Sequence, residues 1–70
     1  MEQHVFSEFD SDALARVAQR RINTLFKVRL SKIRPLGGGQ VVLDVNIDSS
    51  DQTKLTNLIT ALGGRDIFSY

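Results

Sequence analysis

The most constraining feature of the sequence is a run of three glycines, Gly37–Gly39, between two segments in which apolar and polar residues alternate. Such alternation places every second side chain on the same face of a β-strand. The first segment is FKVRLSKIRPL (26–36) and the second is QVVLDVNID (40–48). Because glycine accepts the positive φ angles of tight turns, we predict a β-hairpin in the middle of the chain, with its first strand starting at Phe26.

Helices are predicted on both sides of this hairpin. From Ala13 onward, apolar residues recur at steps of three and four, which gathers them on one helical face. They are Leu14, Val17, Ala18, Ile22 and Leu25. Asp10 or Ser11 can cap this helix through a side-chain oxygen. A second helix is predicted after the hairpin. Ser49 and Gln52 match a capping box at its start, and Gly63 with Gly64 ends it.

Two shorter segments, 3–9 and 65–70, have the composition of strands and complete the order strand, helix, strand, strand, helix, strand. Two β-α-β halves in one small chain favour an α+β, ferredoxin-like βαββαβ fold, with a four-stranded antiparallel sheet and both helices on one face. We expect a single domain over residues 1–70. The other face of the sheet has no local cover, so it is either solvated or in contact with a partner.

The composition is that of a globular protein, with 41% hydrophobic and 24% charged residues. The absence of cysteine excludes disulfides and thiolate metal sites. The N-terminal segment lacks the basic and long apolar regions of a signal peptide, and no apolar run approaches the roughly 20 residues that a membrane helix needs. We therefore expect a cytoplasmic protein that has no membrane segment.

Residues suited to catalysis are scarce. His4 is the only histidine and has no cysteine or obvious nucleophile near it in the sequence, which favours an exposed or strand-paired histidine. Asp44, Asp48 and Asp51 favour a solvated face and a helix N-terminus over a cation site. The glycine turn precedes a strand and therefore lacks the helix dipole of a phosphate loop. We expect no enzymatic activity, no catalytic residue, no metal site and no cofactor.

The basic residues are concentrated in the middle of the chain, although the net charge is only +1. One alternative function is therefore nucleic-acid binding by a ferredoxin-like protein. The basic residues that would serve it are Arg20, Arg21, Lys27, Arg29, Lys32 and Arg34. The predicted third strand carries Asp44 and no aromatic residue, so this alternative is less favoured. A further alternative is an adaptor or inhibitor that adds its edge strand to another protein.

The element order, the helix-opening segment FDSDALARV (9–17), the glycine turn before QVVLDVNID and the closing segment LITALGGRDIFSY (58–70) together resemble the ACT domain. This resemblance implies a small regulatory module of a kind that commonly binds amino acids at interfaces between domains. Its length and the pattern of Phe9, Asp12, Leu14, Arg16 and Val17 look most like the small regulatory subunits of acetolactate synthase. It implies that the chain modulates a catalytic subunit in branched-chain amino-acid synthesis.

The same resemblance implies a site for an amino-acid effector in the loop that leads into the first helix, formed by Asp10, Ser11, Asp12 and Ala13. Many ACT domains have glycine where this chain has Asp12, and the Asp12 carboxylate would repel the carboxylate of an amino acid. Two interpretations of the loop therefore stay open. It either caps its own helix or offers the free helix N–H groups to a ligand.

We also expect the chain to form a homodimer. In a ferredoxin-like sheet the second strand is outermost, and an unpaired edge strand can pair with another strand. ACT-type pairs often join two sheets side by side in this way. The predicted interface consists of Phe26, Lys27, Val28, Arg29 and Leu30.

Overall fold

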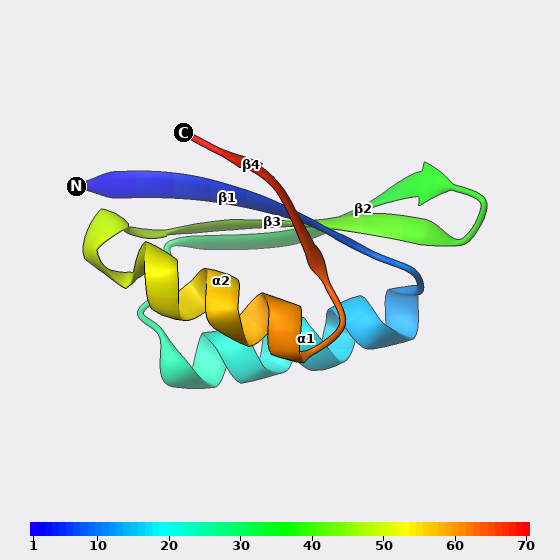
Figure 1. Cartoon of the computed structure of the whole chain (residues 1–70), viewed down its shortest axis with the longest axis horizontal. Coiled ribbons are helices and arrows are strands. Elements are labelled where there is room, and N and C mark those ends of the chain that lie inside the picture. The colour runs from blue at the N-terminus through cyan, green and yellow to red at the C-terminus, as the bar shows by residue number, and fades with distance from the viewer.

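A four-stranded antiparallel sheet carries both α-helices on one face (Figure 1). The computed structural model describes residues 1–70, except for the side chain of Phe68. The elements are β1 (Glu2–Phe9), α1 (Asp12–Leu25), β2 (Leu30–Gly37), β3 (Gln40–Asp48), the 3-10 helix η1 (Ser49–Asp51), α2 (Gln52–Ala61) and β4 (Arg65–Ser69). The sheet order is β2-β3-β1-β4. This confirms the predicted ferredoxin-like fold.

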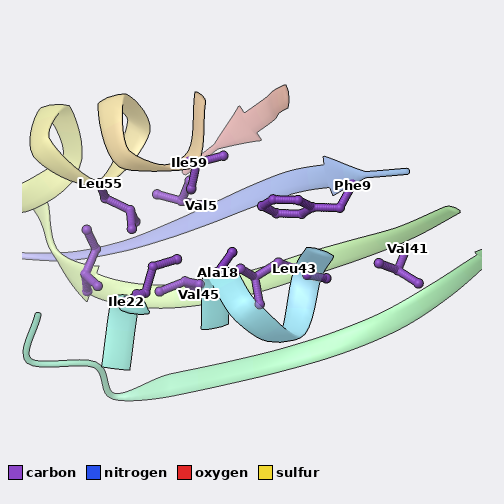
Figure 2. Close-up of a cluster of buried hydrophobic side chains, with 11 residues drawn as sticks. Val5, Phe9, Ala18, Ile22, Val41, Leu43, Val45, Leu55 and Ile59 are labelled. Carbon is purple, nitrogen blue, oxygen red and sulfur yellow. The ribbon is translucent and has the colours of Figure 1, made fainter. Parts of the chain in front are cut away.

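The hydrophobic core lies between the sheet and the helices. Strands β1 and β3 form the centre of the sheet and contribute their inward-facing apolar residues to this core, while α1 and α2 close it (Figure 2). Its buried members are Val5, Phe9, Ala15, Ala18, Ile22, Val41, Leu43, Val45, Ile47, Leu55 and Ile59. Burial of each large aliphatic side chain contributes roughly 1.5–3 kcal/mol to the stability of the fold.

The predicted hairpin is present and links β2 to β3. Gly38 and Gly39 form its two-residue turn, with φ angles of 62° and 83°. A two-residue hairpin turn with positive φ at both positions matches the twist of the flanking strands. The pairing is regular from Leu30 opposite Asn46 to Pro35 opposite Val41.

The start of the second strand differs from the prediction. Helix α1 continues to Leu25, and the backbone N–H of Phe26 still donates to the carbonyl of Ile22 at 2.9 Å. The chain then needs a short connection to reach the sheet, so β2 begins only at Leu30. Phe26 and Val28 are partly buried against the core in this connection. The prediction of a strand that starts at Phe26 is therefore wrong.

The face of α1 that packs on the sheet agrees with the prediction only in part, at Ala18 and Ile22. The buried residues of α1 are Ala15, Ala18 and Ile22. Leu14 and Val17 point away from the core and are 43% and 53% exposed. Small alanine side chains let the helix lie close to the sheet, whereas the larger apolar residues remain on the outside. Helix α1 thus has two apolar sides.

Asp48, not Ser49, caps the segment before α2. Its carboxylate accepts a hydrogen bond from the backbone N–H of Ser50 at 3.0 Å and so begins η1. The side chain of Gln52 donates to the Ser69 hydroxyl at 2.7 Å, which joins α2 to β4. The predicted capping box between Ser49 and Gln52 does not form, because Gln52 is engaged with β4. None of the helices in the described chain is long and apolar enough to cross a membrane.

Candidate functional site

The loop before α1 is held by bonds within the fold. The Ser11 hydroxyl accepts from the N–H of Leu14 at 3.1 Å, which confirms the prediction that Ser11 can cap this helix. Asp12 forms an ion pair with Arg16 one turn further along α1. The exposed Ala13 contributes no polar side-chain group. Binding of a ligand by this loop remains a prediction.

Asp10 belongs to a second set of contacts, which joins the ends of β1 and β4. Arg65 donates to the carboxylate of Glu8 at 2.6 Å and to that of Asp10 at 2.8 Å. These bonds hold the pKa of Asp10 below its ordinary value and raise the pKa of the Arg65 guanidinium. The contacts fix where β4 begins beside β1.

An aromatic stack lies on the face of the sheet that the helices leave uncovered. We use this name for His4 and Phe6 of β1 together with Tyr70, which follows β4. The rings of His4 and Tyr70 are 4.9 Å apart at 15°, and those of Phe6 and Tyr70 are 5.8 Å apart at 17°. The backbones of His4 and Tyr70 exchange two hydrogen bonds, at 2.7 and 2.9 Å. Tyr70 is nevertheless 65% exposed, so the stack offers aromatic surface to the outside.

Buried polar groups lie beside the aromatic stack. Asp44 of β3 is only 3% exposed; its carboxylate lies 3.6 Å from the guanidinium of Arg34 and 3.7 Å from Nδ1 of His4. Neither distance is that of a good hydrogen bond. Among the described residues, no hydrogen-bond partner exists for Asp44 Oδ1, His4 Nδ1 or the side-chain oxygen of Asn46. Polar atoms buried in this way are costly, which marks the region as a candidate site.

Glu2 completes the polar part of this face. The side-chain amide of Asn46 donates to Glu2 Oε1 at 2.6 Å, and this hydrogen bond lowers the pKa of Glu2. Arg29 lies 3.5 Å from the other Glu2 oxygen and lowers the same pKa further by its charge. Across the described residues, no group of three or more His, Cys, Asp or Glu side chains is arranged to hold a metal ion.

The five residues predicted to form an interface do not share one surface. Phe26 and Val28 pack partly against the core, while Lys27 and Arg29 are exposed. Only Leu30 belongs to β2, where it is opposite Asn46 and therefore on the uncovered face. Strand β2 does form one edge of the sheet, as expected, but its edge begins at Leu30. An interface through these residues remains a prediction.

The basic residues proposed for nucleic-acid binding are also divided. Arg20 and Arg21 lie on α1, on the helix side of the sheet, whereas Lys32 and Arg34 lie on the uncovered side with Asp44. Two of the arginines at the uncovered face are paired with carboxylates, Arg29 with Glu2 and Arg34 with Asp44. The structure therefore does not gather the basic residues into one phosphate-binding surface.

The aromatic stack was not predicted from the sequence. The alternation of His4, Phe6 and Glu8 with the buried Val5, Ser7 and Phe9 was the available signal, since residues two apart in a strand share a face. The position of Tyr70 beside His4 depends on the pairing of β1 with β4. No local pattern in the sequence gives that pairing.

The fold and the uncovered face define a small ferredoxin-like domain. No protein-family model and no curated protein matches the sequence. Among solved structures, the chain is similar to the divalent cation tolerance protein (Cut A1) from Thermus thermophilus, with a TM-score of 0.71 and 17% sequence identity. The match covers 100% of this chain and 82% of that one. At this identity the similarity shows the fold alone.

This comparison corrects the expected family. The structural match is a divalent cation tolerance protein and not an ACT-domain regulatory subunit of acetolactate synthase. The resemblance to the ACT domain rested largely on hydrophobic spacing and element order, which any ferredoxin-like chain shares. The assignment to the ACT domain is wrong, and the role in branched-chain amino-acid synthesis that it implied has no support.

Proposed function

We propose that this chain is a non-catalytic regulatory module that pairs with a second copy through its uncovered sheet face and modulates the activity of a partner protein. The observation that carries this proposal is the aromatic stack, in which Tyr70 remains 65% exposed although it is stacked on His4 and Phe6. Aromatic side chains supply much of the energy of protein interfaces. The stack lies on the broad side of the sheet opposite the two helices (Figure 1).

The size of the chain supports pairing. A domain of 70 residues has a small core, and contact with a second copy adds burial that the single chain cannot supply. A stable interface buries roughly 800 Å² on each partner. The chain exposes 4244 Å², so such an interface uses about a fifth of its surface. The uncovered face spans the central strands and is the surface best placed to provide this area.

The buried polar groups give this interface a means of specificity. Asp44 and Asn46 each have a side-chain oxygen without a partner among the described residues, and a second copy brings donors such as Lys32 to the same face. Interfaces in which buried polar groups find partners discriminate strongly against chains that leave them unpaired. A paired module then modulates its target by binding one conformation of that target better than another.

Sedimentation velocity at high micromolar protein concentration tests the proposal. The wild-type chain is expected to sediment as a dimer, and Tyr70→Lys to raise the dimer Kd at least about tenfold, as for loss of an interface anchor. Leu25→Lys is the matched control, because Leu25 is also an exposed apolar residue, at 62%, but lies on α1, on the helix side of the sheet. A wild-type monomer, or equal effects of the two variants, would overturn the proposal.

A binding measurement separates this function from nucleic-acid recognition. Fluorescence anisotropy with labelled single-stranded DNA and RNA is expected to show no binding at physiological salt. If binding appears and weakens steeply with salt, the aromatic stack serves as a base-stacking surface and phosphate contacts supply the affinity. Such binding would contradict the proposed regulatory function and favour nucleic-acid binding instead.

A further inference from the structure

A groove runs along α1 on the helix side of the molecule, opposite the uncovered sheet face. Its cavity volume is about 440 Å³, within the usual range for binding sites. Five of the lining residues come from α1 and the sixth follows the end of α2: Val17, Arg20, Arg21, Thr24, Leu25 and Leu62. Helix α1 packs on β1, β2 and β3, whereas α2 packs on β1 and β4, and this separation leaves room between the helices.

The apolar part of the groove continues along α1. Leu14, Val17 and Leu25 are 43%, 53% and 62% exposed. Their spacing, with Arg21 between Val17 and Leu25, follows steps of three, four and four, which places them on one line along the helix. A helix that is apolar on a solvent-facing side as well as on its core side is typical of a protein that packs against another element.

The charge of the groove is uncompensated. Among the residues that the structure describes, no carboxylate pairs with Arg20 or Arg21. Each of the other four arginines has a carboxylate partner: Arg16 with Asp12, Arg29 with Glu2, Arg34 with Asp44, and Arg65 with Glu8 and Asp10. The two guanidiniums without a partner therefore lie beside the exposed apolar line of α1.

We infer that this groove binds an amphipathic α-helix of a partner protein, with apolar residues toward Val17 and Leu25 and acidic residues toward Arg20 and Arg21. An amphipathic helix presents side chains at steps of three and four, which match the apolar line of α1. Glutamate or aspartate one turn away reaches the guanidiniums, and arginine pairs well with carboxylates in bidentate geometry. The inference deepens the proposed function, because it states the chemistry of the partner that the module modulates.

The charges favour such a partner over a second copy of this chain. A symmetric pair of α1 helices would bring Arg20 and Arg21 of the two copies toward each other, and like charges at an interface are unfavourable. A small aliphatic anion could neutralise the arginines, but it would leave Leu14, which lies outside the groove lining, exposed. A helix of about four turns, roughly 24 Å long, covers both the groove and Leu14.

Selection from a phage-displayed library of random peptides, each about 16 residues long, tests this inference with the full chain as bait. Enriched peptides are expected to carry apolar residues at helical spacing and an excess of Asp and Glu. Calorimetry with the synthesised peptides is expected to show at least about a tenfold loss of affinity for Arg21→Glu and for Val17→Asp. Lys54→Glu is the control, because it makes the same charge change on α2 outside the groove lining. Changing a peptide Glu to Lys should restore binding to Arg21→Glu.

Three results would overturn the inference. They are no enrichment over the bare support, enriched peptides that bind the groove variants as well as the wild type, or binding in the groove of the small aliphatic anion decanoate but of no peptide.

Sedimentation of the same variants keeps the two proposals distinct. Arg21→Glu is expected to leave the dimer intact, since the groove and the aromatic stack lie on opposite sides of the sheet. A dimer that Arg21→Glu dissociates would instead assign the groove to a second copy. If the wild-type chain is a monomer and still binds the peptides, the inference about the groove holds and the proposed dimer is wrong.

Discussion

Gly64 lies directly against the ring of Phe9. A Cβ atom at Gly64 would stand 2.6 Å from Phe9 Cζ and 2.7 Å from Ile59 Cγ2, closer than carbon atoms approach in folded proteins. The two neighbouring glycines thus have different roles. Gly63 has a φ of 91° and ends α2 in the left-handed region, whereas Gly64 lets the chain pass over the core as it enters β4.

We expect Gly64→Ala to lower the free energy of unfolding by about 1–3 kcal/mol, the usual cost of overpacking a core. Urea denaturation measures this change. Phe9→Leu removes the two ring carbons, Cζ and Cε2, that meet the new methyl group, so Gly64→Ala should cost less in the Phe9→Leu background than in the wild type. An equal cost in both backgrounds would place the clash elsewhere.

The two apolar sides of α1 should differ in their contribution to stability. Ile22 is fully buried, so Ile22→Ala is expected to cost about 2–5 kcal/mol. Val17 is 53% exposed, and Val17→Gln should change the free energy of unfolding by no more than about 0.5 kcal/mol. Urea denaturation of both variants at low protein concentration measures the difference. A large loss for Val17→Gln would contradict the assignment of Val17 to the outer side.

The hairpin and the element order could be predicted because strand alternation and glycine turns are local properties. The faces of α1 could not, because steps of three and four fit two different lines along this helix. Leu14 and Val17 are more hydrophobic than Ala15, so hydrophobicity alone added these two outer residues to the predicted stripe and left Ala15 out. The sheet selects the side with Ala15 and Ala18 because small residues allow close packing.

The candidate site depended on contacts that span the whole chain. His4 and Tyr70 are at opposite ends of the sequence, and their stacking follows from the pairing of β1 with β4. The register of that pairing shifts between Phe6 and Ser7, an irregularity that alternation does not predict. The absence of aromatic residues in the third strand was a correct observation, but the aromatic residues of this face come from β1 and from the residue after β4.

Asp44→Val should stabilise the fold by about 1 kcal/mol, because it replaces a buried carboxylate that lacks a good hydrogen bond with an apolar side chain suited to a strand. Urea denaturation measures the gain. The control is Asp48→Val in the same strand, which removes hydrogen bonds with Ser50 and should lower stability instead of raising it. If Asp44→Val instead loses stability, groups other than Arg34 and His4 must also stabilise the Asp44 carboxylate.

Arg65 should control the titration of Asp10. Its hydrogen bond to Asp10 and its charge lower the folded-state pKa of Asp10 below the ordinary value of 3.8. Ionised Asp10 therefore stabilises the fold above pH 3.8, and this contribution is lost as the pH falls through the lowered pKa. Because Asp10 is 63% exposed, solvent screens the pair and the titration is a sharper readout than stability.

Carboxyl-carbon NMR should show the Asp10 midpoint below 3.8 in the wild type and a rise toward 3.8 in Arg65→Gln. Arg16→Gln removes an arginine of equal charge that pairs with Asp12, and it should leave the Asp10 midpoint unchanged. If the midpoint stays low in Arg65→Gln, Arg65 is not its cause, and the link between the ends of β1 and β4 does not rest on this ion pair. A rise confined to Arg65→Gln would show that Arg65 joins the loop before α1 to β4, and so helps to place the strand that positions Tyr70 in the aromatic stack.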